Sequence, residues 1–96
     1  RIAVPGASFF YPVIKLGYLP QPSDPRRLAS LVGPAQAKLI LLAGQKLTAD
    51  EALNVGLIDK VVRDHPVLDH AWGLCAAVAA ADPDVAQKIK AMCPSG

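Results

Sequence analysis

Aromatic residues and cysteines are scarce in this 96-residue chain. Phe, Trp and Tyr together make up 5% of the residues, and two cysteines are present. Cys75 and Cys93 each lie in an apolar pattern typical of helices, so two buried, reduced thiols are expected in place of a disulfide. Thiols kept reduced in this way favour a cytoplasmic location.

The chain also lacks a long hydrophobic run and a concentration of charge of one sign. Apolar runs such as Leu39 to Ala43 are far shorter than the roughly twenty residues that a membrane-spanning helix needs. The ten basic residues are scattered among eight acidic ones, and the net charge is +2. This composition predicts neither insertion in a membrane nor a nucleic-acid partner.

Length and apolar content set the size of the core. A chain of this length forms one domain at most and buries only about two-thirds of the surface that its unfolded form exposes. Hydrophobic residues nevertheless make up 52% of the chain, so part of its surface is expected to pack against something else. The chain opens on Arg1-Ile2-Ala3-Val4 without an initiator Met, and we expect it to be a piece of a longer polypeptide.

Turn signals and apolar periodicity predict two or three short strands followed mostly by helices, an α/β pattern. Short strands are predicted at 1–4 and 8–11, with a third strand or extended segment within 57–62. Helices are predicted at 13–16, 24–33, 34–44, 48–56, 67–81 and from 83 onward. The third of these is apolar nearly all round in its C-terminal half and is expected to be buried there.

The segment 9–28, with the sequence FFYPVIKLGYLPQPSDPRRL, contains four prolines and one glycine. This is too many for one regular element, so the segment is predicted to be a buried strand that leads into a rigid, pocket-forming turn. Asp24 is interpreted as the N-cap of a helix starting at Pro25, and a pocket-facing acid or base is the alternative. Gln21 is either a hydrogen-bond donor to a bound group or a solvated turn residue.

Other polar side chains are interpreted structurally. Tyr11 and Tyr18 are expected to pack with hydrogen-bonded hydroxyl groups. His65 and His70 are five positions apart, with Pro66 between them. That spacing does not place two imidazoles on one helix face as a spacing of four does, so no metal site is predicted.

The order of these residues resembles the crotonase superfamily, the enoyl-CoA hydratase/isomerase family. The family pattern F-x-x-P-E-x-x-x-G-x-x-P-x-x-G-G-x-x-R-L is matched by Phe9, Pro12, Gly17, Pro20, Arg27 and Leu28. The following segment is matched by Val32-Gly33, Ala37, Gly44, Ala49, Ala52 and Gly56-Leu57-Ile58. So many matches at fixed spacing make the resemblance specific.

The resemblance implies a ClpP/crotonase-like spiral of ββα units that binds an acyl-CoA thioester. It implies trimers or hexamers, with no cofactor beyond the coenzyme A carried by the substrate. Two backbone N–H groups form an oxyanion hole for a thioester enolate, and in the family both come from segments upstream of the strand with which this chain begins. Residues 1–96 are therefore expected to be a partial crotonase-like domain that is inactive alone.

The family's glutamate after the first proline is replaced here by Val13, and its Gly-Gly pair by Ser23-Asp24. The resemblance places Pro12, Val13, Pro20 and Gln21 in a wall of the acyl pocket. It leaves no catalytic residue assigned, so whether the chain belongs to an active enzyme stays open. The alternatives are a non-catalytic acyl-CoA-binding or subunit-assembly fragment, and a self-contained helical binding module.

Overall fold

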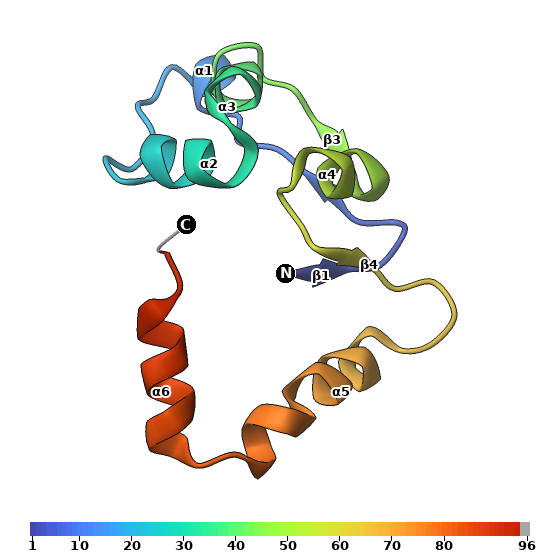
Figure 1. The fold of residues 1–96 in the computed structure, drawn as a ribbon. Helices are drawn as coiled ribbons and strands as arrows, with labels where there is room; N and C mark the ends of the chain where they lie inside the picture. Colours follow the sequence, from blue (N-terminus) through green and yellow to red (C-terminus); the bar gives the residue numbers. More distant parts are fainter. Residues whose placement is uncertain (95–96) are drawn as a thin grey trace.

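The computed structural model describes residues 1–94. In that range six helices and four two-residue strands follow one another along the chain (Figure 1). In chain order they are β1 (Ile2–Ala3), β2 (Ser8–Phe9), α1 (Val13–Leu16), α2 (Asp24–Val32), α3 (Pro34–Leu41), β3 (Leu47–Thr48), α4 (Ala49–Val55), β4 (Lys60–Val61), α5 (Val67–Ala80) and α6 (Pro83–Met92). The predicted α/β pattern of a few short strands and mostly helices is confirmed.

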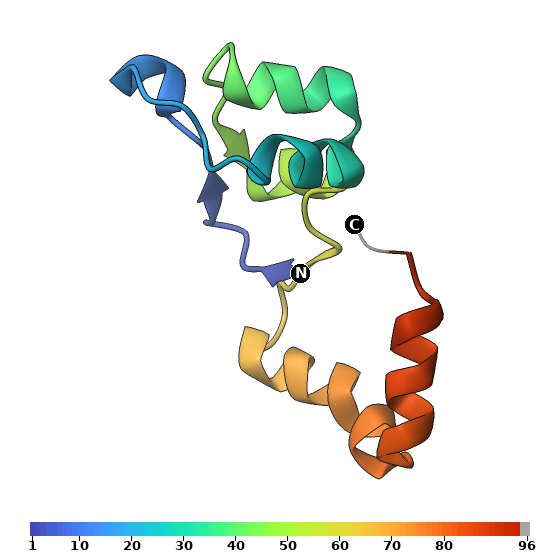
Figure 2. The same cartoon turned by 90° about the vertical axis from the view of Figure 1, so that its left-hand side faces the viewer.

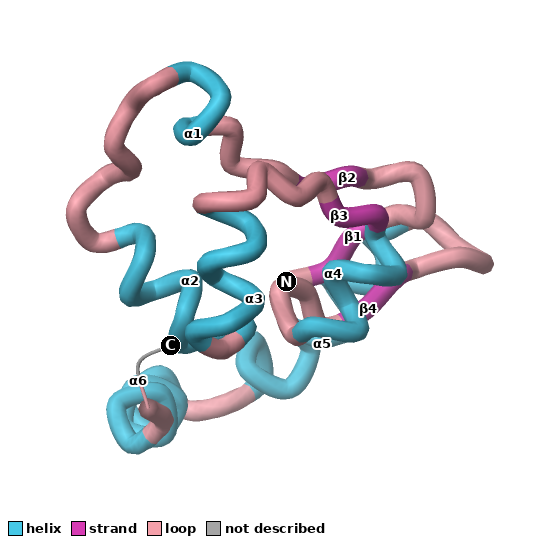
Figure 3. The backbone as a smooth tube through the Cα atoms, turned by 90° about the horizontal axis from the view of Figure 1, so that it is seen from above, coloured by secondary structure: helices cyan, strands magenta, loops and turns pink. Residues whose placement is uncertain are grey.

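The strands pair across long stretches of sequence. β1 pairs in parallel with β4, with Ala3 opposite Val61, and β2 pairs antiparallel with β3, with Phe9 opposite Leu47. Figure 3 shows the two pairs close together beside α4. Two-stranded sheets have little stability of their own, so both depend on the side chains that pack around them.

The core lies where α4 and the two strand pairs meet. Its largest fully buried side chain is Leu47, which is 2% exposed. The buried cluster consists of Ala3, Ile40, Leu47, Ala49, Ala52, Ile58 and Val61. Three of these seven are alanines, so helix and strands approach closely while burying little apolar area. The core is therefore thin, as the length of the chain predicts.

Helix α4 has the ends that its sequence predicts. The Glu51 N–H donates to the Thr48 hydroxyl at 3.2 Å, and the Thr48 N–H donates to the Glu51 carboxylate at 2.9 Å, which completes the capping box. The helix ends at Gly56, whose φ is +87°. A Cβ at Gly56 would lie 3.1 Å from the Leu31 carbonyl oxygen, so this glycine permits both the turn and the approach of α2.

Helix α3 differs from its prediction in length and in burial. It ends at Leu41, three residues before Gly44, and its buried residues are Ala37 and Ile40. Leu42, expected to be buried, is 65% exposed. The predicted burial of the C-terminal half was wrong because α3 packs against α2 on one side (Figure 2), and Leu42 does not lie on that side.

Helices α5 and α6 form an arm that extends away from the core (Figures 1 and 2). Neither has a buried residue. Exposed apolar side chains on this arm are Leu68, Trp72, Leu74, Val78, Val85, Ile89 and Met92. Cys75 and Cys93 are free thiols, but both are exposed rather than buried as expected, because no segment within residues 1–94 covers them. Among residues 1–94, no helix is long and apolar enough to cross a membrane.

Candidate functional site

Strand β2 leads directly into the proline-rich segment that the sequence singles out. Pro12 is the N-cap of α1 and Val13 its first residue. The short helix, predicted at 13–16, ends at Gly17, which has a left-handed conformation with φ +75°. Pro12 and Val13 are half-buried, so the position of the family's glutamate lies at the edge of the packed region and carries an aliphatic side chain.

Tyr11 closes the loop that contains these residues. Its hydroxyl donates a hydrogen bond to Asp24 Oδ2 at 2.6 Å and accepts one from the Gln21 backbone N–H at 3.3 Å. The hydrogen bond to Asp24 raises the pKa of Tyr11 above 10.0, because it stabilises the protonated phenol beside a carboxylate. We call residues 11–24, joined by these two bonds, the clasped loop.

The geometry of the clasped loop corrects the interpretation of Asp24. The N-cap of α2 is Ser23, which makes no side-chain capping bond, and Asp24 is the first residue of the helix. Its carboxylate accepts from Tyr11 instead of from a helix N–H. Helix α2 therefore starts one residue earlier than predicted. The negative charge of Asp24 in the first turn still interacts favourably with the helix dipole.

The turn after α3 supports the clasped loop from outside, a contact that the sequence did not reveal. Gly44 has φ +65°, and a Cβ there would lie 3.1 Å from Lys15 Cε and 3.4 Å from Ile14 Cγ2. The Lys46 ammonium lies 5.4 Å from the centre of the Phe10 ring, within range of a cation–π interaction. Gly44 matched the family pattern. Its left-handed φ and the nearby Lys15 and Ile14 side chains of α1 explain why glycine fits at this position.

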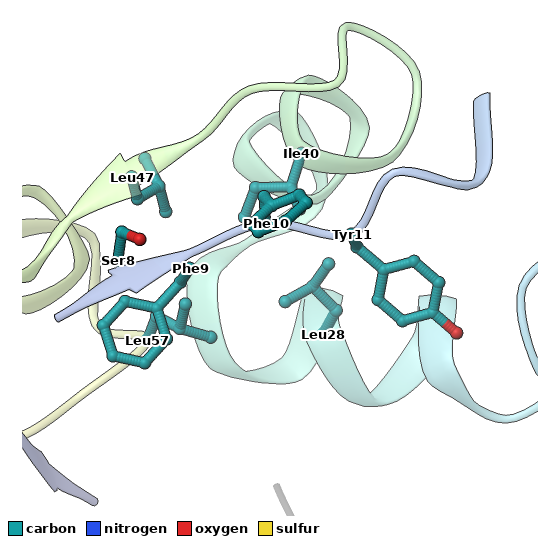
Figure 4. Close-up of a pocket in the computed structure, with 8 residues that line it drawn as sticks. All are labelled: Ser8, Phe9, Phe10, Tyr11, Leu28, Ile40, Leu47 and Leu57. Carbon is teal, nitrogen blue, oxygen red and sulfur yellow. The ribbon is translucent and has the colours of Figure 1, made fainter. Parts of the chain in front are cut away.

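Two small cavities lie beside the clasped loop. The first has a volume of about 330 Å³ and is mostly apolar. Its lining residues, shown in Figure 4, are Ser8, Phe9, Phe10, Tyr11, Leu28, Ile40, Leu47 and Leu57. In Figure 4 the Tyr11 hydroxyl points away from the other labelled side chains. The second cavity, of about 190 Å³, is lined by Asp24, Arg27 and Leu31 among others.

The four predicted pocket-wall residues lie on the clasped loop but outside these cavities. Pro12, Val13, Pro20 and Gln21 line none of the four cavities described for residues 1–94. Pro20 is half-buried and Gln21 is exposed. Tyr18 and Leu19, just before Pro20 in the sequence, are 70% and 92% exposed. For Tyr18 the expected packing is not found.

The two histidines lie together, although their spacing argued otherwise. His65 precedes α5 and turns back, so that its Nε2 is 3.1 Å from Nδ1 of His70. Asp64 Oδ1 is 2.6 Å from the other nitrogen of His65, and this bond lowers the pKa of Asp64 because it stabilises the carboxylate. Within residues 1–94, no group of three or more His, Cys, Asp or Glu side chains has a metal-binding arrangement.

Comparison with known proteins identifies the fold. The chain superimposes on the solved structure of DspI from Pseudomonas aeruginosa with a TM-score of 0.85 and 33% identity, covering 94% of this chain and 34% of that one. It is 41% identical over 68 residues to the crotonyl-CoA hydratase of Syntrophomonas wolfei, which covers 71% of this chain and 26% of that protein. It is 37% identical over 79 residues to a short-chain-enoyl-CoA hydratase of Clostridioides difficile, covering 82% and 51% respectively.

These similarities, with the short strands, the proline-rich turn and the helices that follow, define a crotonase-like fold. The family model for enoyl-CoA hydratase/isomerase matches residues 1–95. The chain belongs to the enoyl-CoA hydratase/isomerase family. It spans between about a quarter and a half of the length of the two curated relatives named above.

Proposed function

We propose that this chain is the C-terminal part of the catalytic domain of an acyl-CoA-processing enzyme that acts through a thioester enolate. The observation that carries the proposal is the clasped loop. Its scaffold positions Pro12, Gly17 and Pro20 are those of the family pattern, and Tyr11 holds its two ends together. Pro12, Val13, Pro20 and Gln21 on this loop then form one wall of an acyl pocket that upstream segments complete.

The chemistry of this wall argues against ordinary hydration. Adding water across a double bond needs groups that accept and donate protons near the operating pH. Val13 does neither, and the clasped loop has Asp24 as its one carboxylate, which is engaged by Tyr11. Isomerisation with one base located elsewhere, or another reaction through a thioester enolate, fits these residues better.

The isolated chain is expected to be inactive. Stabilising an enolate needs preorganised donors aimed at the thioester oxygen, and the segments that supply them in the family are expected upstream. Incubating purified residues 1–96 with crotonyl-CoA and following the loss of the conjugated double bond tests this directly. No hydration above a protein-free control is expected, and measurable hydration would contradict the expected inactivity of the isolated chain.

A second candidate function is non-catalytic acyl-CoA binding or subunit assembly. The observation that favours it is the arm, whose α5–α6 groove of about 630 Å³ is lined mostly by apolar side chains. Exposed apolar surface of this kind marks interaction sites. A trimer or hexamer of the longer protein would bury it, and we propose such a homo-oligomer, in the cytoplasm, for either candidate.

The gene sequence upstream of Arg1 distinguishes the two candidates. A glycine-rich loop together with a helix N-terminus that carries an acidic residue would supply the oxyanion donors and a base, and so favours the enzyme. If the encoded upstream residues contain neither feature, the binding or assembly function is favoured instead.

A further inference from the structure

A three-residue chain of hydrogen bonds lies where the polypeptide leaves β4 and enters α5. Asp64 Oδ1 lies 2.6 Å from His65 Nδ1, and His65 Nε2 lies 3.1 Å from His70 Nδ1. The rings have their centres 5.2 Å apart and are tilted by 32°. No part of the proposed acyl-pocket wall is involved, so an inference about this cluster does not rest on the proposed function.

The carboxylate fixes the tautomer of His65. Because Asp64 accepts the hydrogen bond, Nδ1 of His65 carries the proton and Nε2 of the neutral ring has the lone pair. That lone pair accepts a hydrogen bond from Nδ1–H of His70 at 3.1 Å. Histidines that bind metals usually donate their second ring N–H to a carboxylate in this way, which orients the ring and makes it a better ligand.

The separation of the facing nitrogens suits a shared ion. Bonds of about 2.0–2.1 Å to a tetrahedral Zn²⁺ set two ligand nitrogens about 3.3 Å apart. The observed separation of 3.1 Å is close to this value. A bound ion takes the place of the hydrogen that the two nitrogens share in this contact, and His70 then carries its ring proton on Nε2.

The surroundings leave room for water ligands and set the charge. A cavity of about 460 Å³ adjoins both histidines and is also lined by Lys60, Arg63 and Asp64. The two cationic side chains oppose a metal ion, while Asp64 favours it, and Arg63 is paired with Asp50. Since residues 1–94 supply no third ligand, water would occupy the other coordination positions.

We propose that His65 and His70 bind one Zn²⁺ ion through Nε2 of His65 and Nδ1 of His70, with Asp64 as a positioning residue. The ion joins the segment that follows β4 to the first turn of α5. Because this segment is the connection between the core and the arm, the bound ion restrains the direction in which the arm leaves the core.

Zn²⁺ titration by calorimetry tests the site. The 96-residue chain is used with Cys75→Ser and Cys93→Ser, since both thiols are exposed and would bind zinc themselves. One ion per chain is expected. His65→Gln and His70→Gln should each abolish this binding. His65 is exposed and His70 is half-buried, and circular dichroism checks that each variant keeps the fold.

Comparing Asp64→Asn with Asp84→Asn tests whether Asp64 orients the His65 ring or acts only through its negative charge. Loss of a carboxylate that orients a ligand is expected to weaken Zn²⁺ binding about 10–100-fold, whereas Asp84→Asn on α6 removes the same charge at a distance and should leave it unchanged. Absence of Zn²⁺ binding by the cysteine-free chain would overturn the proposal. So would binding of undiminished affinity in the His65→Gln, His70→Gln double variant, or equal weakening by Asp64→Asn and Asp84→Asn.

Discussion

The hydroxyl of Tyr11 lies 2.6 Å from Oδ2 of Asp24, thirteen positions further along the chain. This bond and the Gln21 N–H donated to the same hydroxyl tie the start of the clasped loop to its end. The loop between them contains Pro12, Val13, Pro20 and Gln21, which we propose as one wall of an acyl pocket. A phenol and a carboxylate thus hold this loop in place, while Val13 has no group that can transfer a proton.

The Tyr11 pKa reports on this bond. In the folded chain it is raised by the hydrogen bond to Asp24, so the stability that the bond contributes is complete below the ordinary tyrosine pKa of 10.0 and is lost as the pH rises through the raised value. In a Tyr18→Phe chain, where Tyr11 is the remaining tyrosine, titration followed by tyrosinate absorbance should give a midpoint above 10.0. Adding Asp24→Asn should lower that midpoint. Identical midpoints with and without Asp24 would contradict the assigned bond.

The second hydrogen bond of the Tyr11 hydroxyl, accepted from the Gln21 N–H, should protect the Gln21 amide from exchange with solvent. In Tyr11→Phe the amide loses its acceptor, so its hydrogen exchange, measured by NMR, should become faster. Tyr18→Phe is the matched control, because Tyr18 is 70% exposed and lies on the same loop. Equal exchange rates in the two variants would show that Tyr11 does not hold Gln21.

Leu47 is expected to carry much of the stability of the thin core. Leu47→Ala removes its largest fully buried side chain and should lower the free energy of unfolding by about 2–5 kcal/mol. Leu42→Ala makes the same chemical change at a site that is 65% exposed and should have a much smaller effect. Urea unfolding followed by circular dichroism compares the two. A similar loss in the free energy of unfolding in both variants would show that Leu47 does not lie in the stabilising core.

The capping box of α4 predicts a smaller, local effect. Thr48→Ala leaves the Glu51 N–H without its acceptor and should cost about 0.5–2 kcal/mol in the free energy of unfolding. Thr48→Ser keeps a hydroxyl acceptor and should retain most of this stability. If alanine and serine destabilise the chain equally, the hydroxyl is not what caps the helix.

Local signals in the sequence were enough to predict most helices. The helices predicted at 13–16, at 48–56 and from 83 onward are each specified by a few neighbouring residues, and all three are found within one residue of the predicted bounds. Strand β3 was missed because two residues are too few for a periodicity. Its existence depends on pairing with β2, a contact between distant parts of the chain.

The candidate site was predictable in position but not in its bonds. The family pattern located the loop, yet it did not show that Asp24 accepts from Tyr11, because a residue at a helix start has the same local sequence whether its side chain caps the helix or bonds elsewhere. His65 and His70 were separated in the prediction because helical spacing was assumed for both. His65 lies before α5, where the backbone turns and brings the rings together.

The most direct test of the account restores the missing carboxylate. The segment of the Syntrophomonas wolfei crotonyl-CoA hydratase that corresponds to residues 1–96, which is longer than the 68 aligned residues, is replaced by residues 1–96. The chimera carries either Val13 or Val13→Glu, and crotonyl-CoA hydration is measured. Since a general acid or base typically contributes about 10²–10⁴-fold, hydration by the Val13→Glu chimera should exceed that by the Val13 chimera by a factor in this range. Equal rates in two folded chimeras would contradict the claim that Val13 removes hydration from this pocket wall.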